Sequence, residues 1–88
     1  MTADQIANLT YACELLKTAS PTEKAANGST AVSFLLRMSR HDSPIVREGA
    51  VYGLEGHLSQ PLVLEKLMDM AANDPSEGVR EAAGEAYG

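Results

Sequence analysis

The stretch Val46-Arg47-Glu48-Gly49-Ala50 decides the fold, because it returns 33 positions later as Val79-Arg80-Glu81-Ala82-Ala83. The residues before it are duplicated as well: residues 35–42 and residues 67–74, 32 positions apart, share Leu, Met and Asp in register. Self-similarity at one fixed period marks a repeat protein, in which each repeat buries its apolar face against the next. We therefore expect stacked copies of one structural unit.

The period places two repeats at residues 29–58 and 59–88, and leaves residues 1–28 as an N-terminal helix or partial repeat. An 88-residue chain is expected to hold these parts in a single domain. Because the chain has only four aromatic residues, its core must consist mainly of Leu, Val, Ala and Met, which suits close helix packing.

Turn signals divide each repeat into two helices, because a capping side chain followed by proline is typical of a helix start. Asp74 and Glu77 are also predicted to form a capping box at the start of the last helix. The predicted starts are Ser43–Pro44, Gln60–Pro61 and Asp74–Pro75, and Thr2 with Gln5 is expected to cap the first helix.

The apolar residues recur with helical period, so no strand is expected. The last helix carries more apolar residues than one neighbouring hairpin is expected to cover: Val79, Ala82, Ala83, Ala86 and Tyr87. The predicted fold is all-α, a short α-solenoid of stacked antiparallel helical hairpins. Its five helices are expected at about residues 3–18, 29–40, 44–57, 61–72 and 75–87, with Gly28 ending a short extra turn.

Two further features concern packing between the helices. Leu64, Leu67, Met68 and Ala71 fall on one stripe of the fourth helix, which we expect to be buried. Three glycines lie inside predicted helices, where glycine is unfavourable, and we expect them to mark places where helices approach closely. These glycines are Gly49, Gly53 and Gly84.

The run from Asp74 to Ala83 resembles the start of the second helix of a HEAT repeat, where the pattern D-x-x-x-V-R-x-x-A is typical. The run from Asp42 to Ala50 shows the same pattern with a shorter turn. The period of 32 to 33 residues is similar to that of the short HEAT-like repeats in phycobilisome-lyase-type proteins. The resemblance implies that Asp42, Arg47, Asp74 and Arg80 form a structural ladder between repeats, so Arg80→Ala is expected to destabilise the fold.

The sequence offers no candidate for catalysis, for cofactor binding or for metal binding. His41 and His57 lack metal-ligand spacing, and the seven glycines are too scattered to form a phosphate-binding loop. Cys13 is the only cysteine, which excludes an intramolecular disulfide. Since the N-terminus also lacks the basic start of a signal peptide, we expect a cytoplasmic protein.

A protein-interaction scaffold without catalytic activity is therefore the predicted function. The resemblance also implies a second hypothesis, a subunit of a cofactor-handling enzyme such as a bilin lyase, and a third is nucleic-acid binding. Residues 59–88 carry −4 of the net charge of −5, which disfavours nucleic acid and anionic membranes as partners. We expect a protein partner, or self-association through the C-terminal helix, at Glu77, Glu81, Glu85 and Tyr87.

Overall fold

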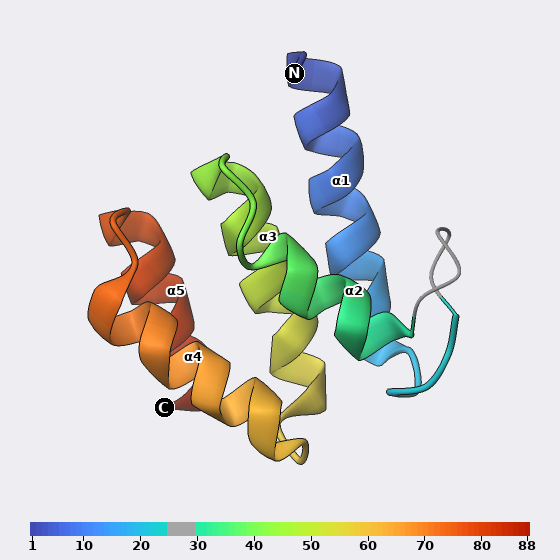
Figure 1. Ribbon diagram of the computed structural model, residues 1–88, viewed down its shortest axis with the longest axis vertical. Helices are drawn as coiled ribbons and strands as arrows, with labels where there is room; N and C mark the ends of the chain where they lie inside the picture. The colour runs from blue at the N-terminus through green and yellow to red at the C-terminus, as the bar shows by residue number, and fades with distance from the viewer. Residues whose placement is uncertain (25–29) are drawn as a thin grey trace.

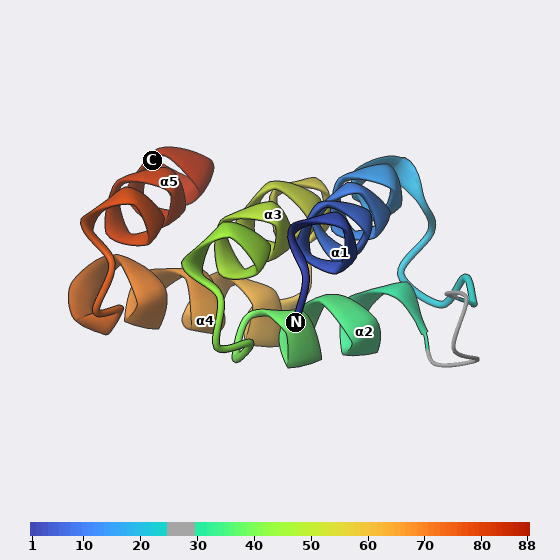
Figure 2. The ribbon, with the colours of Figure 1, turned by 90° about the horizontal axis from the view of Figure 1, so that it is seen from above.

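The computed structural model describes residues 1–24 and 30–88, and its regular elements there are helices. Helices α1, α3 and α5 lie side by side in one layer, and α2 and α4 form a second layer (Figures 1 and 2). The molecule is a slab of 32 × 30 × 16 Å. The helices are α1 (Ala3–Leu15), α2 (Ala31–Met38), α3 (Pro44–Leu54), α4 (Pro61–Asn73) and α5 (Glu77–Tyr87), with the 3-10 turns η1 (Leu16–Thr18) and η2 (Glu55–His57).

The all-α prediction is confirmed, and the helix bounds lie close to the predicted ones. A single antiparallel bridge joins Lys24 and Thr30, and no strand occurs in residues 1–24 and 30–88. The predicted end of an extra turn at Gly28 and the predicted start of the second helix at residue 29 lie outside the described residues. Within them, α2 begins after Thr30, whose hydroxyl accepts a hydrogen bond from the Ser33 amide.

The start of α1 follows the predicted capping chemistry. Thr2 Oγ1 accepts a hydrogen bond from the Gln5 amide, and Gln5 Oε1 accepts one from the Thr2 amide at 2.8 Å. This reciprocal pair satisfies two amides that would otherwise lack a helical partner. Pro44 and Pro61 occupy the first turns of α3 and α4, as the sequence predicted, but the side chain of Ser43 makes no capping hydrogen bond, and neither does that of Gln60.

The predicted start of the last helix is wrong by two residues. Ser76, not Asp74, is the N-cap of α5, and its hydroxyl accepts from the Val79 amide. Asp74 is extended and ends α4, and its carboxylate accepts from the Ser76 amide instead of forming a capping box with Glu77. The same carboxylate also accepts hydrogen bonds from Arg47 on α3.

The core runs between the two layers, and in two places it differs from prediction. On α4 the buried stripe is Val63, Leu67 and Met70, whereas Leu64 is 39% exposed and Met68 52% exposed. Helix α4 is apolar on two adjacent stripes, so its period alone cannot select the inner one. On α5 the hairpin and α3 cover more than we expected, because Val79, Ala82, Ala83 and Ala86 are all buried.

No helix in residues 1–24 and 30–88 has the length and apolar character needed to cross a membrane.

Candidate protein-interaction surfaces

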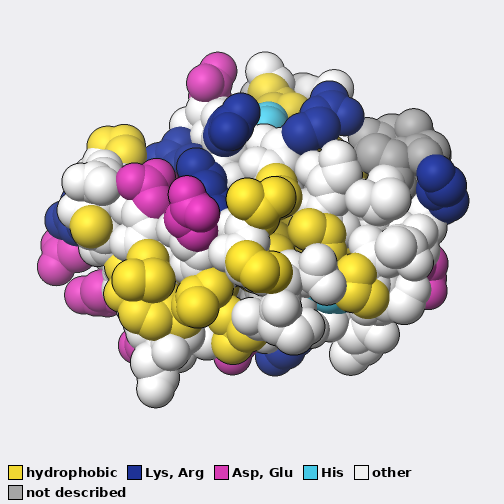
Figure 3. Space-filling view, turned by 60° about the horizontal axis from the view of Figure 1, so that its bottom comes forward, with side chains coloured by type: hydrophobic (Ala, Val, Ile, Leu, Met, Phe, Trp, Pro, Cys, Tyr) yellow, Lys and Arg dark blue, Asp and Glu magenta, His cyan; other side chains and the backbone are white. Residues whose placement is uncertain are grey.

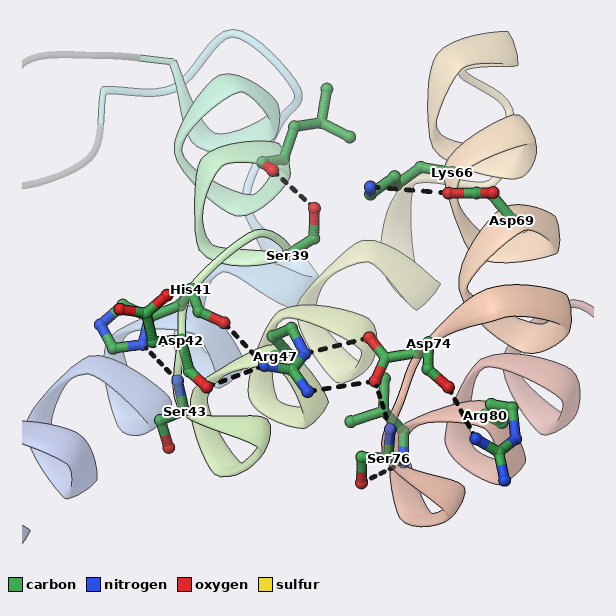
Figure 4. A network of polar contacts seen from close by, with 12 residues as sticks. Ser39, His41, Asp42, Ser43, Arg47, Lys66, Asp69, Asp74, Ser76 and Arg80 are labelled. Carbon is green, nitrogen blue, oxygen red and sulfur yellow. Dashed lines mark hydrogen bonds and ion pairs between the residues drawn. The ribbon is translucent and has the colours of Figure 1, made fainter.

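The two repeats are joined by an ion pair between Arg47 on α3 and Asp74 after α4 (Figure 4). Arg47 Nε donates to Asp74 Oδ2 at 3.0 Å, and Arg47 Nη2 donates to Asp74 Oδ1 at 3.1 Å. The side chains are only 12% and 6% exposed. Two parallel bonds to one carboxylate are the strongest pairing that an arginine can make, and they fix the position of the α4–α5 turn against α3.

Backbone carbonyls complete the network on both sides of this pair. Arg47 Nη1 donates to the carbonyls of His41 at 2.8 Å and Asp42 at 2.9 Å. One repeat later, Arg80 Nη1 donates to the carbonyl of Asp74 at 2.7 Å. The structure thus brings Arg47, Asp74 and Arg80 into one network, whereas Asp42 contributes only its carbonyl and its exposed carboxylate lies outside it.

The acidic residues predicted as an interface lie apart from this network. Glu77, Glu81 and Glu85 are exposed on α5, and Tyr87 is 39% exposed at its end. Their charge extends to α3, where Tyr52 Oη donates to Glu48 Oε1 at 3.0 Å. This hydrogen bond raises the pKa of Tyr52, and partial burial and the nearby carboxylates of Glu48, Glu85 and Glu14 add to the increase. The layer of α1, α3 and α5 therefore presents an acidic face.

A groove between α2 and α4 was not predicted. One part is a hollow of about 550 Å³, and a second hollow of about 410 Å³ continues it along α2. Hydrophobic side chains reach the surface on this side of the molecule, with Lys and Arg side chains beside them (Figure 3). The larger of these two hollows is lined by Leu36, Arg40, Leu62, Glu65, Lys66 and Asp69, and the second adds Thr30, Val32, Ser33 and Arg37.

The charges of the groove are unbalanced in favour of the arginines. Lys66 Nζ lies 3.8 Å from Asp69 Oδ2, so that cation has a carboxylate beside it. Arg37 and Arg40 are exposed, and neither takes part in an ion pair with any residue that the structure describes. Over the whole lining, Arg37, Arg40 and Lys66 stand against Glu65 and Asp69, so the groove has a net charge of +1 and the two arginines are its cationic part. The sequence did not reveal this groove, because its two walls, α2 and α4, are separated along the chain by α3 and come together only in the fold.

Comparison with known protein families matches residues 6–88 to HEAT repeats. The chain belongs to the HEAT repeat family. The match does not separate the short phycobilisome-lyase-type form from other HEAT repeats, so that finer assignment stays a prediction. Searches of curated proteins and of solved structures found no match to this HEAT repeat protein.

The two histidines and the cysteine of this HEAT repeat protein take part in contacts within the fold. His57 is 2% exposed, and its Nε2 lies 2.8 Å from the Leu16 carbonyl at the end of α1. His41 Nδ1 accepts a hydrogen bond from the Ser43 amide. Burial raises the pKa of the Cys13 thiol to about 12, with a smaller contribution from Glu14. Residues 1–24 and 30–88 contain no group of three or more side chains arranged to hold a metal ion.

Proposed function

We propose that this HEAT repeat protein is a protein-binding module without catalytic activity, and that its partner binds in the groove between α2 and α4. The observation that supports this proposal is the combination of apolar and cationic groups at one place. Leu62 is 65% exposed, and it lines both hollows together with Leu36 and Arg40. Exposed apolar side chains beside unpaired arginines are typical of interaction surfaces.

The partner segment should carry both carboxylates and at least one large apolar side chain. Arg37 lies in the last turn of α2 and Arg40 two residues beyond its end, and both line the same hollow, so they can engage two carboxylates of a partner. Burial of Leu62 against an apolar partner side chain contributes roughly 1.5 to 3 kcal/mol. A basic partner lacks the negative charge that these arginines require. A nucleic acid has that charge, but it offers no aliphatic side chain to cover Leu62, and the net charge of −5 on this chain repels its phosphates.

Affinity capture from the native host, followed by mass spectrometry, tests the groove with two matched variants. Leu62→Asp places a charge in the groove. Ile45→Asp is the control, because Ile45 is 58% exposed and, like Leu62, directly follows the proline that begins its helix. We expect proteins that the wild type and Ile45→Asp retain and that Leu62→Asp loses. Retention of the same proteins by all three forms contradicts the assignment of the groove.

The cofactor-handling alternative predicts a different result in the same set of proteins. If the groove holds a bilin, adding bilin to the wild type shifts the absorption spectrum of the pigment, and Leu62→Asp removes that shift. We expect an unchanged spectrum with all three proteins.

A further inference from the structure

The last helix, α5, exposes a stripe of residues whose counterpart on α3 is covered by other helices. On α3, Arg47, Val51 and Leu54 form one stripe, because residues spaced by four and three positions share a helix face. Arg47 is paired with Asp74 between α4 and α5, and Val51 and Leu54 are completely buried in a core that includes residues of α4 and α5. One repeat later, 33 positions along the chain, the corresponding stripe on α5 is Arg80, Gly84 and Tyr87.

The stripe on α5 points away from α3. The opposite side of α5 faces α3, because a Cβ atom on Gly78 would lie 3.6 Å from Glu48 Oε2 and Glu85 acts on Tyr52. At Gly84 an added Cβ would have no atom within 4 Å, and Tyr87 is 39% exposed. Helix α5 is the last of its row, and no element lies beyond it among the residues that are described (Figure 2).

Helix α4 extends this edge with apolar side chains. Leu62 and Lys66 face the groove beside α2, and Leu64 and Met68 lie two positions further along, about half a turn around the helix. Leu64 and Met68 therefore face the open side, where they are 39% and 52% exposed. Leu64, Met68, Arg80, Gly84 and Tyr87 together form what we call the C-terminal edge.

The guanidinium of Arg80 is prepared for a carboxylate. Its Nη1 donates to the Asp74 carbonyl, just as Nη1 of Arg47 donates to the Asp42 carbonyl. Arg47 then uses Nε and Nη2 to hold the carboxylate of Asp74. On Arg80 the same two nitrogens make no hydrogen bond and no ion pair with the residues that the structure describes.

We infer that the C-terminal edge is a docking surface for a helical hairpin of a partner protein, and that this hairpin carries an aspartate in the turn between its helices. The carboxylate of this aspartate accepts hydrogen bonds from Nε and Nη2 of Arg80, as the carboxylate of Asp74 does from Arg47. The hairpin covers Leu64, Met68 and Tyr87. This inference concerns a different surface from the α2/α4 groove and does not depend on it.

A second copy of this chain does not supply that hairpin. Its α4–α5 turn is already held by Arg47 through Asp74. The α2–α3 turn of the second copy carries Asp42. In that copy, however, α1 packs along α3 and occupies the side of α3 that would have to contact α5 of the first copy (Figure 1). Docking in the geometry of the internal junction therefore requires a hairpin whose adjacent edge is free.

The test extends the full chain by a second copy of residues 56–88, placed directly after Gly88. This keeps the repeat spacing, so the appended copy of Asp74 stands where Arg80 can reach it. Tethering gives the probe hairpin a high effective concentration, so weak docking becomes measurable. We expect one cooperative thermal transition at a higher Tm than that of the 88-residue protein.

Two variants test whether Arg80 binds the carboxylate of the appended hairpin. Arg80→Ala should lower the Tm of the extended protein by about 5 °C more than it lowers that of the 88-residue protein. Asp74→Asn in the appended copy alone leaves the first 88 residues intact and should give a similar loss. A separate transition for the appended hairpin, or equal effects of Arg80→Ala in both proteins, overturns the inference. So does a dimer of the 88-residue protein, seen by sedimentation, that Arg80→Ala dissociates.

Discussion

Helix α3 is joined to α1 on one side and to the α4–α5 hairpin on the other, and the two junctions are built by opposite means. Toward α1 it presents glycines, and the backbones come so close that there is no room for side chains between them. Toward α4 and α5 it presents Arg47, Val51 and Leu54, whose side chains fill the space. The junction with α1 thus depends on the absence of side chains, whereas the junction with α4 and α5 depends on particular side chains. The two should respond to different substitutions.

The glycine side of α3 is described by what a Cβ atom would meet. On Gly49 it would lie 2.8 Å from Thr10 Cγ2, and on Gly53 it would lie 2.5 Å from Leu35 Cδ2 and closer still to the Cys13 carbonyl. On Gly56 it would overlap the Lys17 carbonyl. These positions place three successive turns of α3 and η2 against α1 and η1.

The largest effect is expected from Asp74→Ala, on the side-chain junction. It leaves Arg47 without its carboxylate at a site where the arginine side chain is only 12% exposed. Removal of one partner from such a pair costs about 3 kcal/mol of unfolding free energy, which urea denaturation measures. Asp42→Ala is the matched control at the corresponding turn of the preceding repeat, with an expected change of about 0.5 kcal/mol or less. Equal losses in the two variants would contradict this role for Asp74.

A smaller loss is expected from Gly53→Ala, on the glycine junction. The added methyl group collides with the Cys13 carbonyl and with Leu35, and overpacking of this kind costs roughly 1 to 3 kcal/mol. Gly84→Ala is the control, because its methyl group meets no atom within 4 Å and should raise stability by up to about 1 kcal/mol through helix propensity. Thermal denaturation of both variants should show shifts of Tm in opposite directions.

The smallest effect is expected from pH, through Cys13 in the same junction. Folding raises the pKa of its thiol from 9.0 to about 12, so between these values the unfolded chain loses a proton that the folded chain keeps. Stability should therefore fall as pH rises through this window, by about 1 kcal/mol between pH 9 and pH 10. Urea denaturation at both pH values should show that Cys13→Ala removes this part of the loss. A loss of the same size in Cys13→Ala would mean that other groups cause it.

The sequence predicted the side-chain junction better than the glycine junction. Arg47 recurs as Arg80 and Asp42 recurs as Asp74, and this repetition marked all four residues. The sequence did not show that only Arg47 and Asp74 form an ion pair, because that depends on which turn lies beside which helix. Close approach was expected at Gly49, Gly53 and Gly84, and it is correct for the first two but wrong for Gly84, which faces open space. A glycine looks the same in the sequence whether a neighbouring backbone touches it or not, so only tertiary contacts distinguish these positions.

The groove and the inner face of α4 could not be predicted from the sequence for the same reason. Both the buried stripe of Val63, Leu67 and Met70 and the exposed pair Leu64 and Met68 have helical period. The choice between them depends on how α4 packs on α3 and α5, and this also determines which side of α4 faces α2. Leu62 could not be recognised as a groove residue until that orientation was known.

The most direct test of this account is a double-mutant cycle on Arg47 and Asp74, measured by urea denaturation of the wild type, Arg47→Ala, Asp74→Ala and the double variant. If the two residues hold α3 against the α4–α5 turn as one unit, the loss in the double variant should fall short of the sum of the single losses by about 2 kcal/mol. Losses that add within about 0.5 kcal/mol would show that the ion pair does not join the repeats.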